Sequence, residues 1–333
     1  MWVAVDAMSA EQGYETVMAG TAMAVRELGA KVILVGDENV MARLLQSYPD
    51  IRPNVRLVHT DQVVTMQEHP AMAVKTKKNA SVNICARLVR DSEAVGFFSP
   101  GNTGATMAAA LSNLGRLPGV KRPAIATPIP REDGRANVLL DAGANVDCKS
   151  EYLVQFAIMG EVYAREILGV INPKIGLLSN GEEEIKGNEQ TLEAFQKLKK
   201  LPYDFVGNVE GRDLFGTGKP VDVIVCDGFI GNIVLKSLEG LAKTIFNILR
   251  TNIKASPLAT AGALMLKPAF MAVKNRMDYA SYGGAPLLGV AGITVIGHGS
   301  SNAWAIRNAI RVTLEFAKND VLFRIQENIR RYG

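Results

Sequence analysis

The chain has 333 residues, of which 48% are apolar and 21% charged, and its formal net charge at pH 7 is +4. This length and apolar content allow one large α/β domain or two smaller ones, while so small a net charge argues against a nucleic-acid partner. Three cysteines and three histidines are scattered along the chain, which disfavours a disulfide framework and a histidine-rich metal site.

The first residues of the sequence and its most apolar region bear on the localisation of the protein. The first residues lead directly into WVAVD, without a basic region or a long apolar stretch, so we expect no signal peptide. The most apolar region, residues 256–273, is interrupted by Pro257, Lys267 and Pro268, which disfavours a membrane span. Together with unpaired cysteines, this predicts a cytoplasmic protein.

Short β-branched runs alternate with longer amphipathic runs along most of the chain. We expect strands over residues 2–6, 31–36, 55–60, 95–99, 124–130, 137–143, 174–180, 221–228 and 293–299. Amphipathic stretches such as 13–28, 150–168 and 188–199 lie between many of them. Continuously apolar strands separated by helices predict a largely parallel sheet with helices on both faces. The alternation stops at about 230–280, where two or three helices are expected without a strand between them.

The segment SPGNTG, residues 99–104, lies between an expected strand and an expected helix. A helix start offers unpaired backbone N–H groups and the positive end of the helix dipole, and glycines let a ligand approach closely. Phosphate is the anion most often bound at such a helix N-terminus. Turn geometry and helix capping favour the same residue types, so this segment alone leaves both interpretations open.

Six expected strand ends carry glycine together with Asn, Asp, Ser, Lys or His. In parallel sheets, ligands bind outside the carboxyl ends of the strands, so six such ends at one edge of one sheet would line a shared cleft. Each of them alone is equally typical of a helix cap or a turn. The residues concerned include Asp6, Ser99, Gly101, Asn102, Thr103, Asn145, Asp147, Lys186, Asn188, Asp227, Gly231, Asn232, Lys236, His298, Ser300, Ser301 and Asn302.

The expected cleft is rich in hydrogen-bond donors and poor in catalytic bases. The sequence has no GxSxG, no GxGxxG and no Walker A motif. This pattern suits a reaction whose nucleophile is already an anion, where the enzyme supplies positioning and charge stabilisation.

These segments together resemble the PlsX family of phosphate acyltransferases, which transfer a fatty acyl group from acyl carrier protein to inorganic phosphate. The matching stretches cover nearly the whole chain in the family's order. They are VDAM (5–8), SPGNTGA (99–105), VLLDAGANVDC (138–148), LLSNGEEEIKGNE (177–189), YDFVGNVEGRDLF (203–215), VDVIVCDGFIGNIVLKSLEG (221–240) and YGGAPLLGVAGITVIGHGSSNAWAI (282–306).

One loop departs from the family pattern. The family usually continues VDAM with Gly-Gly-Asp, whereas this chain has Ser9, Ala10 and Glu11. Glu11 keeps a carboxylate at the position of the aspartate, with one more methylene. The departure leaves the role of this first loop open.

The resemblance implies a single domain over residues 1–333 with a Rossmann-like α/β/α sandwich, similar to the isocitrate dehydrogenase and phosphotransacetylase folds, and a protruding helical hairpin. It also implies a homodimer that needs no metal and no nucleotide, with Lys186 and Asn232 as the central catalytic pair. Without the resemblance, Lys186 after its acidic run is equally typical of a solvated surface lysine.

The hypothesis for the site is that inorganic phosphate binds at the helix start after SPGNTG and attacks the thioester carbonyl directly. Asn232, or the N–H of Gly231, would stabilise the oxyanion, and Lys186 would supply positive charge. His298 either assists the leaving thiol or serves in capping and packing. The expected substrate-binding residues are Asp6, Ser99, Gly101, Asn102, Thr103, Gly104, Asp141, Asn145, Asn180, Asn188, Asp227, Gly231, His298 and Ser300.

Asp141, Asp147 and Asp227 leave two interpretations open. They can orient Lys186 and the hydrogen-bond donors, or they can hold a divalent cation. Because they belong to different motifs and would repel a phosphate if left uncompensated, we expect no metal.

The helical segment of about 230–280 is expected to serve dimerisation and membrane contact. Its residues 256–273 are apolar with basic flanks, which is typical of an interfacial helix and equally of a helical hairpin buried in a dimer. The family associates peripherally with the inner face of the cell membrane. Candidates for docking the acidic carrier protein are Lys267, Lys274, Arg276 and Arg307.

Two other functions remain open from the sequence. A phosphate acetyltransferase would carry out nearly the same chemistry on a coenzyme A thioester. A non-catalytic scaffold that binds acyl phosphate would keep the site without turnover.

Overall fold

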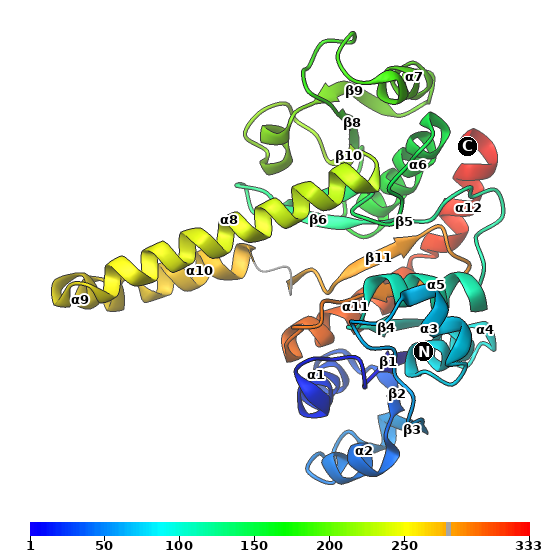
Figure 1. Cartoon of the computed structure of the whole chain (residues 1–333), viewed down its shortest axis with the longest axis vertical. Helices are drawn as coiled ribbons and strands as arrows, with labels where there is room; N and C mark the ends of the chain where they lie inside the picture. Colours follow the sequence, from blue (N-terminus) through cyan, green and yellow to red (C-terminus); the bar gives the residue numbers. More distant parts are fainter. Residues whose placement is uncertain (278–280) are drawn as a thin grey trace.

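A computed structural model of the protein describes the backbone of residues 1–277 and 281–333, and the side chains of residues 1–273 and 281–333. Within these residues the strands form two sheets, one of seven strands and one of five, whose arrangement Figure 1 shows. Most neighbouring strands run parallel, as expected, and the antiparallel pairs join residues 285–288 with 293–296 and with 124–125, and residues 127–130 with 136–140.

The first sheet contains the N-terminal strands and the last strands of the chain. Its order is β3 (Val55–His59), β2 (Lys31–Gly36), β1 (Trp2–Asp6), β4 (Gly96–Ser99), β12 (Ile293–Ile296), β11 (Ala285–Leu288) and β5 (Ala124–Ile125). The second sheet contains the middle of the chain. Its order is β6 (Thr127–Pro130), β7 (Ala136–Leu140), β10 (Val223–Val225), β8 (Lys174–Leu178) and β9 (Asp204–Val209).

The prediction of a single strand over 124–130 is wrong, and with it the prediction of a single sheet. Ile125 pairs with Leu287 in the first sheet, whereas Thr127 pairs with Leu139 in the second. Between them the Ala126 N–H donates to the carbonyl of Pro286 at 3.0 Å. The chain therefore passes from one sheet to the other within a single apolar run, and the expected strand ends belong to two sheets.

Helices cover both faces of each sheet, as the alternation predicts. They are α1 (Gly13–Leu28), α2 (Glu38–Leu45), α3 (Pro70–Thr76), α4 (Ser81–Arg90), α5 (Thr103–Asn113), α6 (Ser150–Glu166), α7 (Glu189–Leu198), α8 (Gly228–Lys254), α9 (Pro257–Met265), α10 (Lys267–Met277), α11 (Ala303–Lys318) and α12 (Val321–Tyr332). Two short 3₁₀ helices, η1 (Arg52–Asn54) and η2 (Gly211–Phe215), complete the described elements.

The alternation of side chains along β1 explains the layers of the first sheet. Val3 and Val5 pack into one cluster with α1 and α11, whereas Ala4 packs into another with α4 and α5. Successive side chains of a strand point to opposite faces, so a strand buried on both faces is apolar throughout. The second sheet is built alike, with α6 on one face and the first turns of α8 with η2 on the other.

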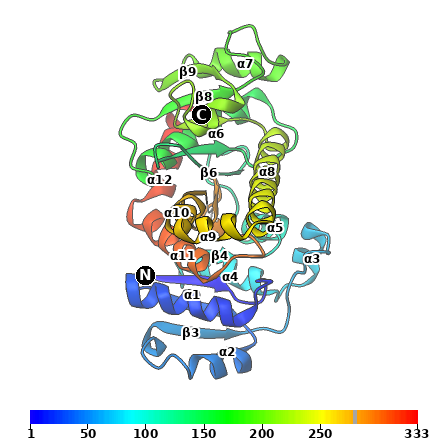
Figure 2. The same cartoon turned by 90° about the vertical axis from the view of Figure 1, so that its left-hand side faces the viewer.

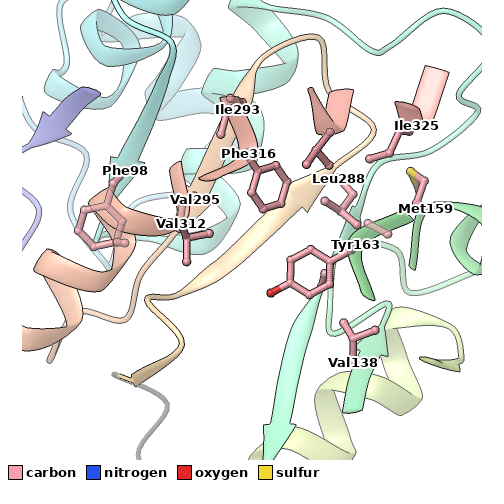
Figure 3. Packing of buried hydrophobic residues seen from close by; sticks show 14 of the residues in the cluster. Phe98, Val138, Met159, Tyr163, Leu288, Ile293, Val295, Val312, Phe316 and Ile325 are labelled. Atoms are coloured by element: carbon pink, nitrogen blue, oxygen red, sulfur yellow. The ribbon is translucent and has the colours of Figure 1, made fainter. Parts of the chain in front are cut away.

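One continuous core joins the two sheets. Tyr163 of α6 and Phe316 of α11 are both buried, and their ring centroids lie 5.8 Å apart. Figure 3 shows these two rings, with Leu288 of β11 lying between the labelled residues that pack on the first sheet and those that pack on the second. Because α6 covers the second sheet and α11 the first, this contact fixes the halves against each other.

The sequence pattern did not predict two of the strands, β9 and β11. β9 contains Gly207 at a φ of +86° and a register shift against β8, which disturbs its apolar alternation. β11 has four residues and includes Pro286, a residue type depleted in strand interiors. Both features remove the pattern by which a strand is recognised.

The expected helical segment is present in the described residues as α8, α9 and α10, while residues 278–280 lie outside them. The segment projects from the body as an arm, with α9 at its tip (Figure 1). Figure 2, seen toward that tip, shows α1 and α2 at one end of the molecule and α7 with β9 at the other. No helix among the described residues has both the length and the apolar character required to cross a membrane.

Candidate active site

A cavity of about 340 Å³ lies where the two sheets and the root of the arm meet. The start of α5, strands β5 and β6, the loop after β7, α8 and the segments beside β11 and β12 all contribute to it. It is lined by Thr103, Gly104, Met107, Ile125, Thr127, Pro128, Ala142, Gly143, Asn232, Leu235, Lys236, Glu239, Tyr282, Gly284, Ala285, Ile296, Gly297 and His298.

The start of α5 forms one wall of this cavity. Asn102 caps the helix, because its side-chain oxygen accepts the N–H of Ala105 at 3.1 Å. Thr103 and Gly104, the first two helical residues, line the cavity, and the first N–H groups of a helix have no carbonyl partner within it. A Cβ at Gly101 would lie 2.5 Å from the Cβ of Ser9, so only glycine fits there.

Asp6 holds two loops together beneath α5. Its carboxylate is fully buried and accepts the hydroxyls of Ser9 at 2.6 Å and Ser99 at 2.8 Å. The N–H groups of Met8 and Ser9 donate to the same carboxylate. Thus Ser9, where the chain departs from the family pattern, contributes a hydrogen bond to this network. Neither Asp6 nor Ser99 lines the cavity.

Asp141 is the most heavily bonded carboxylate of the region. It is fully buried, and its two oxygens accept the N–H groups of Ile125, Gly143, Ala144 and Asn145 and the side-chain amide of Asn145, at 2.8–3.2 Å. Burial raises the pKa of its carboxyl, although these hydrogen bonds act in the opposite direction. Because its acceptors face the protein, Asp141 shapes the loop that carries Gly143 into the cavity.

The first turn of α8 packs against that loop. Asp227 caps the helix by accepting the N–H of Ile230 at 2.8 Å. A Cβ at Gly231 would overlap the carbonyl oxygen of Asp141. The Gly231 N–H, which we expected as a donor to the oxyanion, instead donates within the helix to the Asp227 carbonyl. The close packing against Asp141 explains why this position holds a glycine. Asn232, one residue further, is exposed and lines the cavity.

His298 approaches from the other sheet. It lines the cavity, and its Nδ1 lies 2.7 Å from the Ser300 hydroxyl. Its backbone N–H donates to the Ser301 hydroxyl at 3.1 Å, which fixes the turn after β12. Ser300 and Asn145 do not line the cavity, and the Asn145 amide donates to the Pro123 carbonyl at 2.7 Å. Thr103, Gly104, Asn232 and His298 are therefore the expected site residues that share one cavity.

Lys186 lies outside this cavity. It is exposed, and a Cβ at Gly181 would lie 2.8 Å from its Cγ. Its neighbours Asn180 and Asn188 line an adjacent pocket of about 420 Å³, together with Ile230. Asn188 also caps α7 by accepting the N–H of Thr191 at 2.9 Å. The first turn of α8 thus contacts both pockets, and the role of Lys186 stays a prediction.

Several cavity residues were not identified from the sequence as site residues. Lys236 and Glu239 form an ion pair at 2.8 Å on the exposed part of the cavity wall. They follow Asn232 at positions four and seven along α8, which places them on the same helical face. Lys236 was among the strand-end residues expected at the cleft, whereas helical spacing was the available signal for Glu239. Apolar lining residues such as Met107 and Leu235 have the periodicity of ordinary core residues.

The cysteines near the site are unsuited to nucleophilic attack. Burial raises the pKa of the Cys148 thiol to about 12 and raises that of Cys226 as well. The thiolate is the reactive form, so both remain protonated at neutral pH. Among the described residues, no group of three or more His, Cys, Asp or Glu side chains is arranged to hold a metal ion.

Comparison with known proteins extends over the whole chain. Residues 1–324 match the model of a family described as "Fatty acid synthesis protein". The phosphate acyltransferase of Leptospira biflexa is 59% identical over 332 residues, covering 100% of this chain and 98% of the relative. The phosphate acyltransferase of Pelotomaculum thermopropionicum is 51% identical over 330 residues, covering 99% and 95%.

Solved structures show the same fold at low sequence identity. A phosphotransacetylase from Streptococcus pyogenes has a TM-score of 0.64 at 17% identity, with 96% of this chain and 94% of that chain covered. The EutD phosphotransacetylase from Staphylococcus aureus has a TM-score of 0.60 at 17% identity, with 95% and 94% covered. The expected α/β sandwich of the phosphotransacetylase type is therefore confirmed.

The bonding of Asp141 gives a stability prediction. Asp141→Ala leaves buried N–H donors of two segments without an acceptor, and each unpaired buried donor costs about 1–3 kcal/mol. We expect the free energy of unfolding to fall by at least about 3 kcal/mol, measured by urea denaturation. The control is Asp147→Ala, at an exposed position of the same loop. Equal stability of the two variants would contradict the assigned role of Asp141.

Proposed function

The chain belongs to the PlsX family of phosphate acyltransferases, and from this premise we propose that its acyl donor is the thioester of an acyl carrier protein. The reaction transfers the acyl group to inorganic phosphate and supplies phospholipid synthesis. The observation that carries the proposal for the site is the single cavity lined by the start of α5, Asn232 and His298.

Phosphate binds at the start of α5 in this proposal. The N–H groups of Thr103 and Gly104 and the Thr103 hydroxyl are the donors, and the helix dipole favours the anion. A phosphate oxygen attacks the thioester carbonyl carbon, the carbon–sulfur bond breaks, and the sulfur leaves with the carrier. Acyl phosphate remains, and no acyl-enzyme forms.

Negative charge develops on the carbonyl oxygen and on the leaving sulfur during this reaction, and the other residues near the cavity can stabilise it. The Asn232 side-chain amide donates to the oxyanion of the tetrahedral intermediate. His298 delivers a proton to the departing sulfur. As the family resemblance implies, Lys186 supplies positive charge that compensates the charge of the phosphate, and this role requires its exposed side chain to extend from outside the cavity toward the start of α5. Lys236 is a second candidate, because it lines the cavity itself.

The reaction is tested by incubating the purified protein with acylated carrier protein and following free thiol. Release that depends on inorganic phosphate, with acyl phosphate as product, supports the proposal. The matched donor is the coenzyme A thioester of the same acyl group. Higher turnover of the coenzyme A thioester would favour the acetyltransferase-like alternative, and binding without turnover of either donor would favour a scaffold.

The two lysines can be separated by substitution. We expect Lys186→Ala to lower kcat/KM for phosphate about a hundredfold or more, in line with the loss of one transition-state contact, without loss of stability, because its side chain is exposed. Lys236→Ala is the matched variant. Full activity of Lys186→Ala together with a large loss in Lys236→Ala would transfer the role to Lys236.

The arm supports proposals for assembly and membrane contact. The α8 residues Phe229, Ile233, Leu241, Ile245 and Ile248 are about half exposed and recur at helical spacing. We assign this stripe to the homodimer contact. At the tip, Leu258, Leu264, Met265 and Leu266 are more than half exposed, and we assign them to peripheral contact with the inner face of the cell membrane.

Carrier docking remains a proposal with two described candidates. The Lys267 side chain lies beside a groove between α8, α9 and α10, and Arg307 pairs with Glu27 at 2.9 Å. The side chains of the other two candidates, Lys274 and Arg276, lie outside the described residues.

Membrane contact is tested at the tip of the arm. The double substitution Leu264→Glu and Leu266→Glu is expected to release the protein from anionic lipid vesicles in flotation, because charge at these exposed apolar positions opposes burial in the interface. Ile171→Glu, at an apolar residue of the body that is even more exposed than Leu264 and Leu266, is the control and should still float. Unchanged flotation of the double variant would exclude the tip as the contact.

A further inference from the structure

The candidate cavity is polar at its rim and apolar at its floor. The lining side chains of Thr103, Asn232, Lys236, Glu239 and His298 are exposed. The buried lining residues are Ile125, Pro128, Ala142 and Ile296, with exposed fractions of 4–6% for the three that belong to the hydrophobic clusters. The exposed polar and charged side chains of the rim are therefore separated by depth from the buried apolar side chains of the floor.

Two half-buried side chains stand between the rim and the floor. Met107 follows Gly104 by three residues along α5, and Leu235 follows Asn232 by three residues along α8. A spacing of three residues keeps a side chain on the same helical face, about one turn further along. Met107 and Leu235 both pack against the cluster that contains Ile125, Ala142 and Ile296.

We infer that this floor, with Met107 and Leu235 as its walls, is the subsite for the hydrocarbon chain of the acyl donor. The inference rests on the proposed function, which places the thioester carbonyl beside the start of α5 and Asn232. An acyl donor is itself polar at the thioester and apolar beyond it, so its two parts match the two parts of the lining.

The composition of the floor argues for a hydrocarbon in preference to a polar ligand. A nucleotide base or sugar buried there would need partners for its hydrogen-bonding groups, and the floor side chains Ile125, Ala142 and Ile296 offer none. A saturated chain has no such requirement, and each methylene transferred from water contributes about a fourfold gain in affinity.

Met107 and Leu235 are then the residues that set chain-length preference. Met107 is unbranched and adapts its shape to its surroundings, so its replacement changes the available volume with little change in polarity. A larger side chain at position 107 shortens the space behind the carbonyl, and a smaller one extends it.

The test measures kcat/KM for saturated acyl thioesters that lengthen by two methylenes at a time, at saturating inorganic phosphate. Met107→Trp is expected to lower the ratio of long-chain to short-chain kcat/KM at least about tenfold, and Met107→Ala to move the ratio in the opposite direction. Leu111→Trp, at a half-buried residue four positions further along α5 and outside the cavity lining, is the matched control and should keep the wild-type ratio.

The outcomes separate this inference from the proposed function. Wild-type protein that forms no acyl phosphate from any donor refutes the function. Wild-type protein that is active, with position 107 variants that change all donors by the same factor, refutes the subsite and leaves the function standing. If Met107→Trp does not fold, as shown by its thermal unfolding, Leu235→Phe gives the same test from the facing helix, with the same shift expected.

Discussion

The buried carboxylate of Asp141 is the constraint on which the candidate site depends. Its oxygens accept the Ile125 N–H of the first sheet and the N–H groups of the loop that follows β7 in the second. The same loop receives the first turn of α8, where Gly228 donates to the Asn145 carbonyl at 2.7 Å and Gly231 admits the Asp141 backbone. One side chain thus fixes both sheets and the root of the arm, and the cavity is the space left among them.

Other polar side chains at the ends of strands also bond to the protein itself. Asp6 accepts the hydroxyls of Ser9 in its own loop and Ser99 in the loop after β4, Asp227 accepts the Ile230 N–H at the start of α8, and the Asn102 amide likewise caps α5. These residues shape the backbone, so the groups presented to a ligand are helix-start N–H groups and a few side chains. Such a rim suits an anionic nucleophile, because its charge is met by donors already fixed in place.

The sequence predicted the strands that are buried on both faces, because their apolar runs are continuous. It could not show that residues 124–130 divide between two sheets, since both parts are equally apolar and the division is made by pairing with Leu287 and Leu139. At the site, four of the expected residues, Thr103, Gly104, Asn232 and His298, line the cavity, whereas Lys186 lies outside it. Met107 and Leu235 escaped notice, because a residue lining a cavity and a residue filling the core have the same helical spacing.

The arm has a geometric consequence for where product can go. α8 is a single uninterrupted helix of 27 residues, so about 40 Å separate its root, beside the cavity, from its outer end. If only the outer end of α8 touched a bilayer and the arm were upright, the mouth of the cavity would lie far from the bilayer surface. An apolar product would then have to cross water to enter the bilayer. If the tip contacts a bilayer as proposed, an arm lying flat along the headgroups would remove that gap, and the tilt of α8 would then decide between release into water and direct transfer into lipid.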